Sequence, residues 1–335
     1  MHGEPVFLEL SDAVVMRAGK PILSVDSFRL AAGEHVALLG PNGSGKSTFV
    51  SLITREVFPL HRDAAPVRFK GRDRVTLAEV KQCLGVVSAT MQDQITVHLP
   101  VVDVVAGGLF GALGIPARVD DADKTRARIR ALEALALLGV DDLAERDIMT
   151  LSTGQARRAL IARALVHDPE TLVLDEPCAG LDPEGMYAVR ASMRTLARAG
   201  KGIILVTHYP EDVIPEIQRV VLLKDGAVFA DGLKQELFTD GRMSALFGVP
   251  LQVKRTTVER NAACESVGCG SVADACADVS RETRAALLAG AGDAVRESAA
   301  ARSGVERTAQ SAESFSASSV DVSSVDEYFS LVSAY

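Results

Sequence analysis

A glycine-rich stretch at residues 40–48, GPNGSGKST, has the residue types and spacing needed to bind phosphate groups. It fits the pattern G-x-x-x-x-G-K-[ST] through Gly40, Gly45, Lys46 and Ser47. Glycines let backbone N–H groups close around phosphate oxygens, and a following helix N-terminus adds positive potential. We expect Lys46 to reach the β- and γ-phosphates and the Ser47 hydroxyl to ligate Mg²⁺. The residues expected to contact the nucleotide here are Gly40, Pro41, Asn42, Gly43, Ser44, Gly45, Lys46, Ser47 and Thr48.

Two further apolar stretches end in side chains that can act on a bound phosphate. TLVLDEP, residues 171–177, contains Asp175 and Glu176 at its end. We expect Asp175 to lie beside the glycine-rich turn and to hold Mg²⁺ directly or through water. Glu176 can turn toward the γ-phosphate and position or deprotonate an attacking water. ILVTH ends at His208, whose imidazole can hydrogen-bond the γ-phosphate, so these residues predict a catalytic site for ATP with Mg²⁺.

A second turn with phosphate-binding chemistry opens the stretch LSTGQARRALIARAL at residues 151–165. Ser152 and Thr153 are residue types that cap helices, and good helix formers follow them. The N-terminus of a helix presents unpaired N–H groups and a partial positive charge, which suit a γ-phosphate. The chain therefore has two phosphate-binding turns, which lie far apart in the sequence and differ in chemistry.

Alternating strand and helix patterns are expected to position these residues. From about residue 5 to about residue 250, β-branched or leucine-rich runs such as VFLEL, HVALL and GIILVTH alternate with helical patterns. This alternation predicts an α/β sheet with helices on its faces. Between Leu99 and Leu151 the strand signal fades, and DKTRARIRALEALALLGV at residues 123–140 predicts a helical insertion.

Five motifs together resemble the ATP-binding cassette of ABC transporters: GPNGSGKST, LSTGQ, LVLDEP, AGLD and TH. They occur in the order and approximate spacing of that family, so residues from about 5 to 250 are identified as a member of it. The resemblance implies a RecA-like P-loop NTPase core with an antiparallel β-subdomain and an inserted helical subdomain at about residues 90–155. These parts would form an ABC ATPase domain over residues 1–254. The resemblance also implies that ATP hydrolysis is coupled to a membrane permease.

The resemblance gives the second turn a role in a dimer. It places LSTGQ on the helical subdomain, too far away to reach the ATP held by the same chain. The turn would instead close over the ATP of a second cassette, a copy or a close paralogue, in a head-to-tail pair. Each ATP would lie between Lys46 of one subunit and Ser152 of the other. The residues implied for this second half of the site are Ser152, Gly154, Gln155 and Asp182, the last of which lies in AGLD.

Among the positions that depart from the usual pattern of the family, two concern contacts with Mg²⁺ and with the adenine. A glutamine that senses Mg²⁺ and the attacking water is usual after one strand, but Ala89 occupies its most usual register in LGVVSATMQDQ. Gln92 and Gln94 are the available replacements, and we favour Gln92 as the residue at the metal. An aromatic residue usually stacks on the adenine, and here Arg17 is the nearest candidate, since a guanidinium can lie flat on a base. A solvated arginine is an equal alternative.

The composition changes after Lys254. Residues 255–335 are rich in Ala and Ser, with seven basic and twelve acidic side chains, and are poor in large apolar groups. We therefore expect an acidic tail that is largely disordered, although RETRAALLAGAGDAVRESAAARS could form an interrupted helix. Its cysteines lack C-x₂-C spacing and a nearby His, so incidental cysteines are favoured over a zinc site. They are Cys264, Cys269 and Cys276.

Composition limits the environment and the partners. The net charge of −8 disfavours binding of nucleic acid. Neither a signal peptide nor a membrane span is expected, because Val101–Pro116, the nearest apolar candidate, is broken by Asp103, glycines and a proline. The scattered cysteines fit a reducing cytoplasm. We expect a cytoplasmic protein, peripheral at the inner face of the cell membrane, that docks on integral permease subunits with help from residues 97–108.

The sequence says little about the cargo. The VSATMQ loop followed by VVDVVAGG is similar to cassettes linked to metal or oxyanion uptake. The alternative function is a soluble, non-transport ABC ATPase acting on ribosomes or DNA, which the single cassette, the spacing of its motifs and the acidic balance disfavour. A degenerate nucleotide-binding regulator is disfavoured because the residues for hydrolysis are all present, namely Lys46, Asp175, Glu176 and His208.

Overall fold

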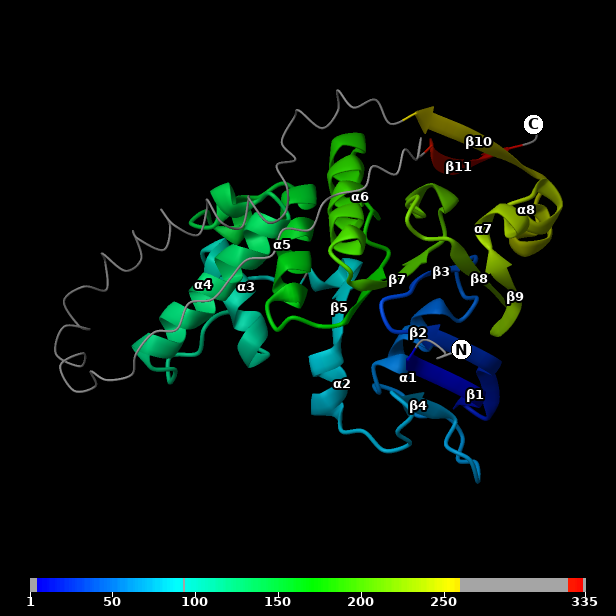
Figure 1. Ribbon diagram of the computed structural model, residues 1–335, viewed down its shortest axis with the longest axis horizontal. Helices are drawn as coiled ribbons and strands as arrows, with labels where there is room; N and C mark the ends of the chain where they lie inside the picture. The colour runs from blue at the N-terminus through cyan, green and yellow to red at the C-terminus, as the bar shows by residue number, and fades with distance from the viewer. Residues whose placement is uncertain (1–4, 93, 260–324, 334–335) are drawn as a thin grey trace, which may run out of the picture. The chain divides into compact units, whose positions relative to one another are not determined.

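The computed structural model describes residues 5–92, 94–259 and 325–333 (Figure 1). The chain divides into two compact units, Met1–Thr257 with Glu327–Tyr335, and Val258–Asp326. The first unit holds a nine-stranded sheet and the helices of the described part. Those helices are α1 (Lys46–Ile53), α2 (Leu77–Cys83), α3 (Val101–Ala106), α4 (Asp121–Leu137), α5 (Thr153–Leu165), α6 (Pro183–Arg198), α7 (Lys234–Leu237) and α8 (Asp240–Phe247).

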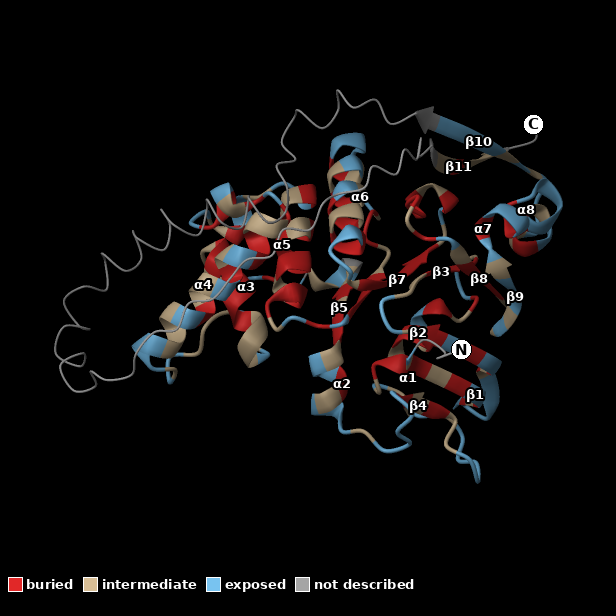
Figure 2. Cartoon of the chain, viewed as in Figure 1, coloured by how far each residue is buried: buried red, intermediate tan, exposed pale blue. Residues whose placement is uncertain are grey.

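The nine strands lie in the order β4-β1-β2-β9-β8-β3-β7-β6-β5. Five of them form a parallel half, in which β3 pairs with β8 and β7, and β6 pairs with β7 and β5. These strands are short, apolar and mostly buried, as expected for a parallel sheet covered on both faces (Figure 2). They are β3 (His35–Leu39), β5 (Leu84–Ser88), β6 (Thr171–Asp175), β7 (Gly202–Thr207) and β8 (Arg219–Lys224).

The other half of the sheet is mostly antiparallel. β1 pairs with β2 and β4, and β8 pairs with β9, all antiparallel, whereas β2 meets β9 in a single parallel pair at Ser24 and Ala227. The predicted α/β fold with a RecA-like core and an antiparallel β-subdomain is confirmed. The strands of this half are β1 (Val6–Arg17), β2 (Lys20–Ala31), β4 (Val67–Phe69) and β9 (Ala227–Leu233).

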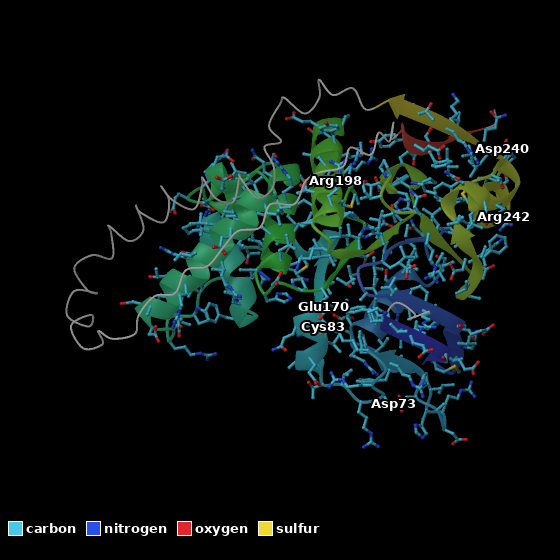
Figure 3. The ribbon with its side chains drawn as sticks, in the orientation of Figure 1. Asp73, Cys83, Glu170, Arg198, Asp240 and Arg242 are labelled. Atoms are coloured by element: carbon cyan, nitrogen blue, oxygen red, sulfur yellow. The ribbon has the colours of Figure 1, made fainter. Side chains whose placement is uncertain are left out.

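Backbone hydrogen bonds connect the strand edges to the segments around them. The N–H of Glu170, just before β6, donates to the carbonyl of Cys83 at the end of α2 (3.1 Å), and both residues lie together in Figure 3. β5 begins at the next residue, Leu84, and pairs with Thr171. These contacts set the register of β5 beside β6. They therefore also fix which residues follow the two strands at their carboxyl ends.

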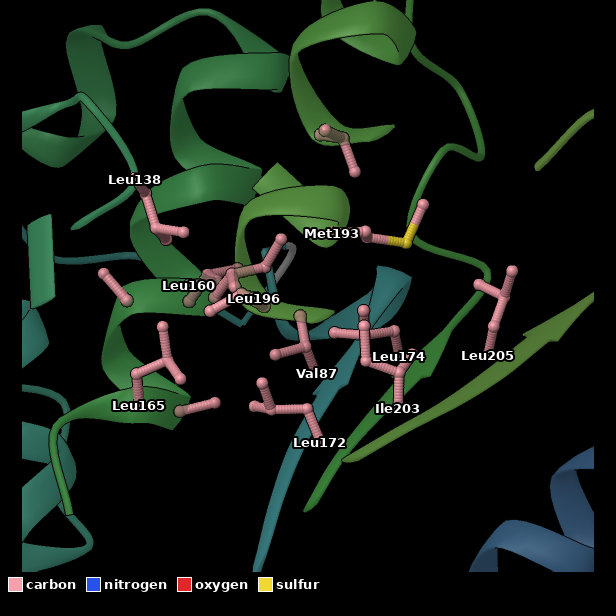
Figure 4. Close-up of a cluster of buried hydrophobic side chains, with 14 of the residues drawn as sticks. Val87, Leu138, Leu160, Leu165, Leu172, Leu174, Met193, Leu196, Ile203 and Leu205 are labelled. Carbon is pink, nitrogen blue, oxygen red and sulfur yellow. The ribbon is translucent and has the colours of Figure 1, made fainter. Parts of the chain in front are cut away.

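Two hydrophobic clusters cover the two faces of the sheet. Alternate residues of β7 show this, because Ile203 and Leu205 belong to one cluster while Ile204 and Val206 belong to the other. Figure 4 shows part of the first cluster, in which leucines of α5 and α6 pack over β5, β6 and β7. The core therefore holds the parallel strands rigidly from both sides.

Helices α3, α4 and α5 follow β5 and precede β6 in the sequence, and they pack against one another. Asp120 caps α4, since its Oδ1 accepts a hydrogen bond from the N–H of Asp123 (2.7 Å). The expected helical insertion is thus present, but its last helix continues to Leu165 because apolar residues of α5 remain buried to that point. Among the described residues, no helix is both long and apolar enough to cross a membrane. Short 3₁₀ turns complete this region and the loops: η1 (Ala89–Met91), η2 (Gly107–Phe110), η3 (Asp141–Leu143), η4 (Ile148–Thr150) and η5 (Pro210–Asp212).

A separate two-stranded sheet joins β10 (Leu251–Glu259) and β11 (Val325–Ser333). Both strands extend into the segment for which the sequence predicted a largely disordered tail. β11 carries several large apolar side chains, and one of them, Phe329, is only 2% exposed. Burial of this side chain stabilises the strand. The composition of the tail as a whole does not reveal this local group of apolar side chains. The cysteines at positions 264, 269 and 276 lie outside the described residues.

Candidate functional site

The glycine-rich loop connects β3 to α1 and has a conformation that depends on its glycines. Gly43 and Gly45 have positive φ angles of 79° and 103°, a region that favours glycine. A Cβ at Gly40 would lie 2.2 Å from the carbonyl oxygen of Leu223, so only glycine fits there. The carbonyl of Ser44 accepts a hydrogen bond from the N–H of Gly226 (3.1 Å), which joins the loop to the turn between β8 and β9. The end of β8 and the turn after it therefore contact the loop at both Gly40 and Ser44.

Lys46 begins α1 and points back into the loop. Its Nζ donates to the carbonyl oxygens of Gly40 (2.7 Å) and Pro41 (3.1 Å), and the residue is 7% exposed. Burial lowers the pKa of Lys46, while Glu176 and Asp175 nearby raise it. The loop thus holds a buried ammonium whose two partners are backbone carbonyls, which phosphate oxygens can replace.

Asp175 and Glu176 lie at the carboxyl end of β6, between its two parallel neighbours. Asp175 is paired with Ser88 of β5 and Val206 of β7. Burial raises the pKa of Asp175, the neighbouring Glu176 carboxylate raises it further, and Lys46 lowers it. A cation close to Asp175 would favour its charged form, as Mg²⁺ would.

Glu176 lies between Lys46 and the residue that follows β7. Its Oε1 is 4.0 Å from Lys46 Nζ and 2.8 Å from His208 Nδ1. Since the carboxylate only accepts, Nδ1–H of the imidazole donates. The backbone of Glu176 has a φ of 51°, which is uncommon for a residue with a side chain and is found at functional sites. The structure therefore brings Lys46, Glu176 and His208 together, and their catalytic roles stay predictions.

Buried acceptors without a protein partner occur on three segments at this edge of the sheet. In the described part of the chain, Oε2 of Glu176, Oε1 of Gln92 and Oγ of Ser44 are buried and make no hydrogen bond. Buried polar atoms of this kind normally have partners, so a ligand or water would satisfy them. The residues present fit Mg·ATP on this ground.

The structure also separates the two candidate glutamines after β5. Gln92 directly follows η1 and has the buried, unpaired Oε1, whereas Gln94 is exposed. Ser47 is exposed at the start of α1. No group of three or more His, Cys, Asp or Glu within the described residues could hold a metal ion alone. Mg²⁺ is usually bound by one or two protein ligands together with substrate phosphates and water, and Ser47, Asp175 and Gln92 stay its predicted ligands.

The LSTGQ turn begins α5 with a capping box. Ser152 Oγ accepts from the N–H of Gln155 (3.3 Å), and Gln155 Oε1 accepts from the N–H of Ser152 (3.1 Å). Ser152 and Thr153 are exposed. Across the part of the chain that the structure covers, no hydrogen bond or ion pair joins this turn to the loop at residues 40–48.

The AGLD segment is packed directly against this second turn. Asp182 caps α6, since its Oδ1 accepts from the N–H of Gly185 (2.8 Å). A Cβ at Gly154 would lie only 2.9 Å from the Cα of Gly185, so the two helix starts touch through glycines. Arg157, one turn into α5, is 3% exposed and donates to the carbonyl of Glu176 (3.4 Å). Ser152 and Gln155 at one helix start and Asp182 at the other therefore flank the buried contact between Gly154 and Gly185.

Arg17, the candidate for stacking on adenine, is the last residue of β1. The side chain is exposed at the turn between β1 and β2, where Arg17 pairs with Lys20. The same hairpin borders the loop, because a Cβ at Gly45 would contact Leu23 Cδ1 at 3.2 Å. These contacts do not include Arg17 itself, so its stacking on adenine stays a prediction.

A supporting network around His208 was missed by the sequence analysis. Thr207 Oγ1 donates to Asp212 Oδ2 (3.0 Å) and accepts from the N–H of Tyr209 (3.0 Å). Asp212 is 1% exposed and is also paired with Arg190 Nη2 on α6 (2.7 Å). Only folding brings Arg190 to Asp212, so no local motif could have revealed this pair.

A family model, related sequences and solved structures that are similar to this chain all carry the name of ABC transporters. Residues 23–179 match the family model described as ABC transporter. The chain is 30% identical over 250 residues to an uncharacterized ABC transporter ATP-binding protein, YlmA, of Bacillus subtilis (strain 168), covering 74% of this chain and 93% of YlmA. It is 34% identical over 222 residues to the cobalt import ATP-binding protein CbiO of Rhodobacter capsulatus, covering 65% and 76% of the two chains. The solved structure of cbiO1 from Clostridium perfringens, titled as part of the ABC transporter complex cbiONQ, is similar with a TM-score of 0.61 and 26% identity, covering 72% and 94%.

Proposed function

The chain belongs to the family of ABC transporter ATP-binding proteins, which hydrolyse ATP, and we propose that it is the ATPase subunit of an importer with separate permease subunits. The observation that carries the proposal is Glu176, which is shared between Lys46 and His208 at the end of β6. Relatives named for cobalt import and for the cbiONQ complex support import and favour a metal ion as the cargo.

ATP binding would use the groups that the loop already presents. Lys46 would exchange its bonds to Gly40 and Pro41 for bonds to the β- and γ-phosphate oxygens. Ser47, Asp175 and Gln92 are the residues that would hold Mg²⁺. The ion would neutralise charge on the β- and γ-phosphates.

Hydrolysis would depend on Glu176 and His208. The buried Oε2 of Glu176 makes no hydrogen bond in the structure and is free to accept one from an attacking water. His208 donates to the other oxygen, Oε1, and so fixes the direction of the carboxylate. When ATP is bound, the same imidazole could donate to the γ-phosphate, which would link the occupancy of the site to the loop that follows β7.

A second cassette would complete the site. Ser152 and Thr153 are exposed at the start of α5. The positive end of that helix is therefore available to a phosphate group from outside the chain. We infer that this turn binds the ATP held by a second copy or a close paralogue, with Asp182 in the same interface. This head-to-tail pairing makes each ATP a contact between two subunits.

Substitution of Glu176 tests the proposal. Glu176→Gln keeps the shape of the side chain but removes the base, so we expect ATP binding to persist while turnover falls by about 10²- to 10⁴-fold. With Mg·ATP, the full-length variant should elute as a dimer and, when purified from detergent-treated membranes, retain an integral membrane partner.

The matched control is Glu56→Gln, which makes the same change at an exposed residue near the end of α1. It should hydrolyse ATP at the normal rate. Near-normal turnover of Glu176→Gln would contradict the role of Glu176. Recovery of the trapped protein with ribosomes or DNA, and without a membrane protein, would favour the non-transport alternative.

A further inference from the structure

The C-terminal strand β11 is bound to the cassette through a buried aromatic side chain. Phe329 is 2% exposed and packs edge-on against Phe238, with 5.1 Å between ring centroids. The guanidinium of Arg255 on β10 lies 5.3 Å from the centre of the Phe329 ring. An aromatic ring buried in this way anchors the strand to the core of the cassette.

Polar contacts of β11 reach two elements that lead to the ATPase site. Arg194 Nη1 on α6 donates to Tyr328 Oη (2.9 Å). The N–H of Leu331 donates to Glu211 Oε1 on η5 (3.0 Å). Glu211 lies three residues after His208, so β11 bridges α6 and the segment that carries the histidine.

The same two elements are joined to each other by the network that surrounds His208. Asp212 on η5 pairs with Arg190 on α6 and accepts from Thr207, while Thr207 accepts from the N–H of Tyr209. Thr207 and Tyr209 are the neighbours of His208 on either side. A shift of η5 relative to α6 would therefore be transmitted to the backbone at His208 and to its hydrogen bond with Glu176.

We propose that β11 is a positioning segment of the ATPase site: it holds η5 against α6 so that His208 stays within hydrogen-bond distance of Glu176. The inference rests on the proposed function, because it assigns β11 a part in ATP hydrolysis. The hydrogen bonds of β11 given above lead to α6 and η5, and not to the glycine-rich loop at residues 40–48. Loss of β11 should therefore lower kcat and leave ATP binding unchanged.

The test uses Phe329→Asp in the full-length chain, since a buried carboxylate would release the strand. We expect kcat to fall by about tenfold, with KM for ATP within about twofold of the wild type, because small displacements of catalytic groups cost rate and not binding. Tyr328→Phe removes only the hydroxyl that Arg194 binds and should give a smaller fall in kcat. Hydrogen exchange should become faster at residues 209–213 in Phe329→Asp.

The control is Phe58→Asp, the same change at a phenylalanine that is 71% exposed, and its kcat should equal that of the wild type. An unchanged kcat in Phe329→Asp, or unchanged exchange at residues 209–213, would overturn the inference. A loss of ATP binding would also overturn it, because β11 would then support the fold in general. Absence of ATPase activity in the wild type would instead refute the proposed function.

Discussion

At the scale of single residues, the proposed ATPase site centres on Glu176, which the sequence predicted from LVLDEP. The apolar strand pattern and the Asp-Glu pair were sufficient to predict its position, because the carboxyl ends of parallel strands meet at one edge of the sheet. The positive φ of Glu176 and the network of Thr207, Arg190 and Asp212 were not predictable, since they arise from contacts between separate elements. The assignment of Gln92 to the metal stays a prediction, which its buried, unpaired amide oxygen supports.

Cys178 gives a prediction at this scale. It follows Glu176 by two residues, is buried, and burial raises its pKa to about 12, with Asp212 as the next cause. Because the thiolate is the reactive form, Cys178 should stay unmodified by iodoacetamide at neutral pH in the folded protein. Its reaction should begin only as the pH approaches 12 or the protein unfolds.

Cys83 is the internal control, because it is only partly buried and should be alkylated before Cys178. Peptide mass spectrometry of protein labelled for increasing times measures both sites in one sample. Alkylation of Cys178 as fast as that of Cys83 at neutral pH would contradict the structure.

At the scale of elements, the two helix starts at Ser152 and Asp182 form one unit. The sequence predicted that LSTGQ begins a helix, and the capping box of Ser152 and Gln155 confirms it. It did not predict that α5 touches α6 at Gly154 and Gly185, because this contact joins two motifs across the fold. The close approach explains why small residues follow both caps.

Gly154→Ala tests this contact. The added Cβ would lie 2.9 Å from the backbone of Gly185, so α5 and α6 would have to move apart. We expect the free energy of unfolding to fall by about 1–3 kcal/mol, as for other overpacked sites. Chemical denaturation followed by circular dichroism measures the change.

Gly241→Ala is the matched control, since nothing lies within 4 Å of its added Cβ in α8. Replacing a helical glycine there should leave stability unchanged or raise it by about 0.5–1 kcal/mol. Equal stabilities of the two variants would show that α5 and α6 do not meet at Gly154.

At the scale of the whole molecule, the fold class and the order of its subdomains were predictable because family motifs fix them along the chain. β11 was not, because its stability comes from Phe329 packing on Phe238 and not from its own composition. The central claim also belongs to this scale. It is the proposal that the glycine-rich loop of one chain and the capped helix start at Ser152 of a second chain form one ATP site.

Mixing two inactive variants tests this claim most directly. Lys46→Ala removes the loop ammonium, and Ser152→Arg blocks the second turn, so each variant alone should have almost no turnover. In a head-to-tail dimer of one of each, one site keeps both Lys46 and Ser152, and an equal mixture should recover up to about a quarter of wild-type ATPase activity. A mixture no more active than the separate variants, or full activity of either variant alone, would contradict a site shared between two chains.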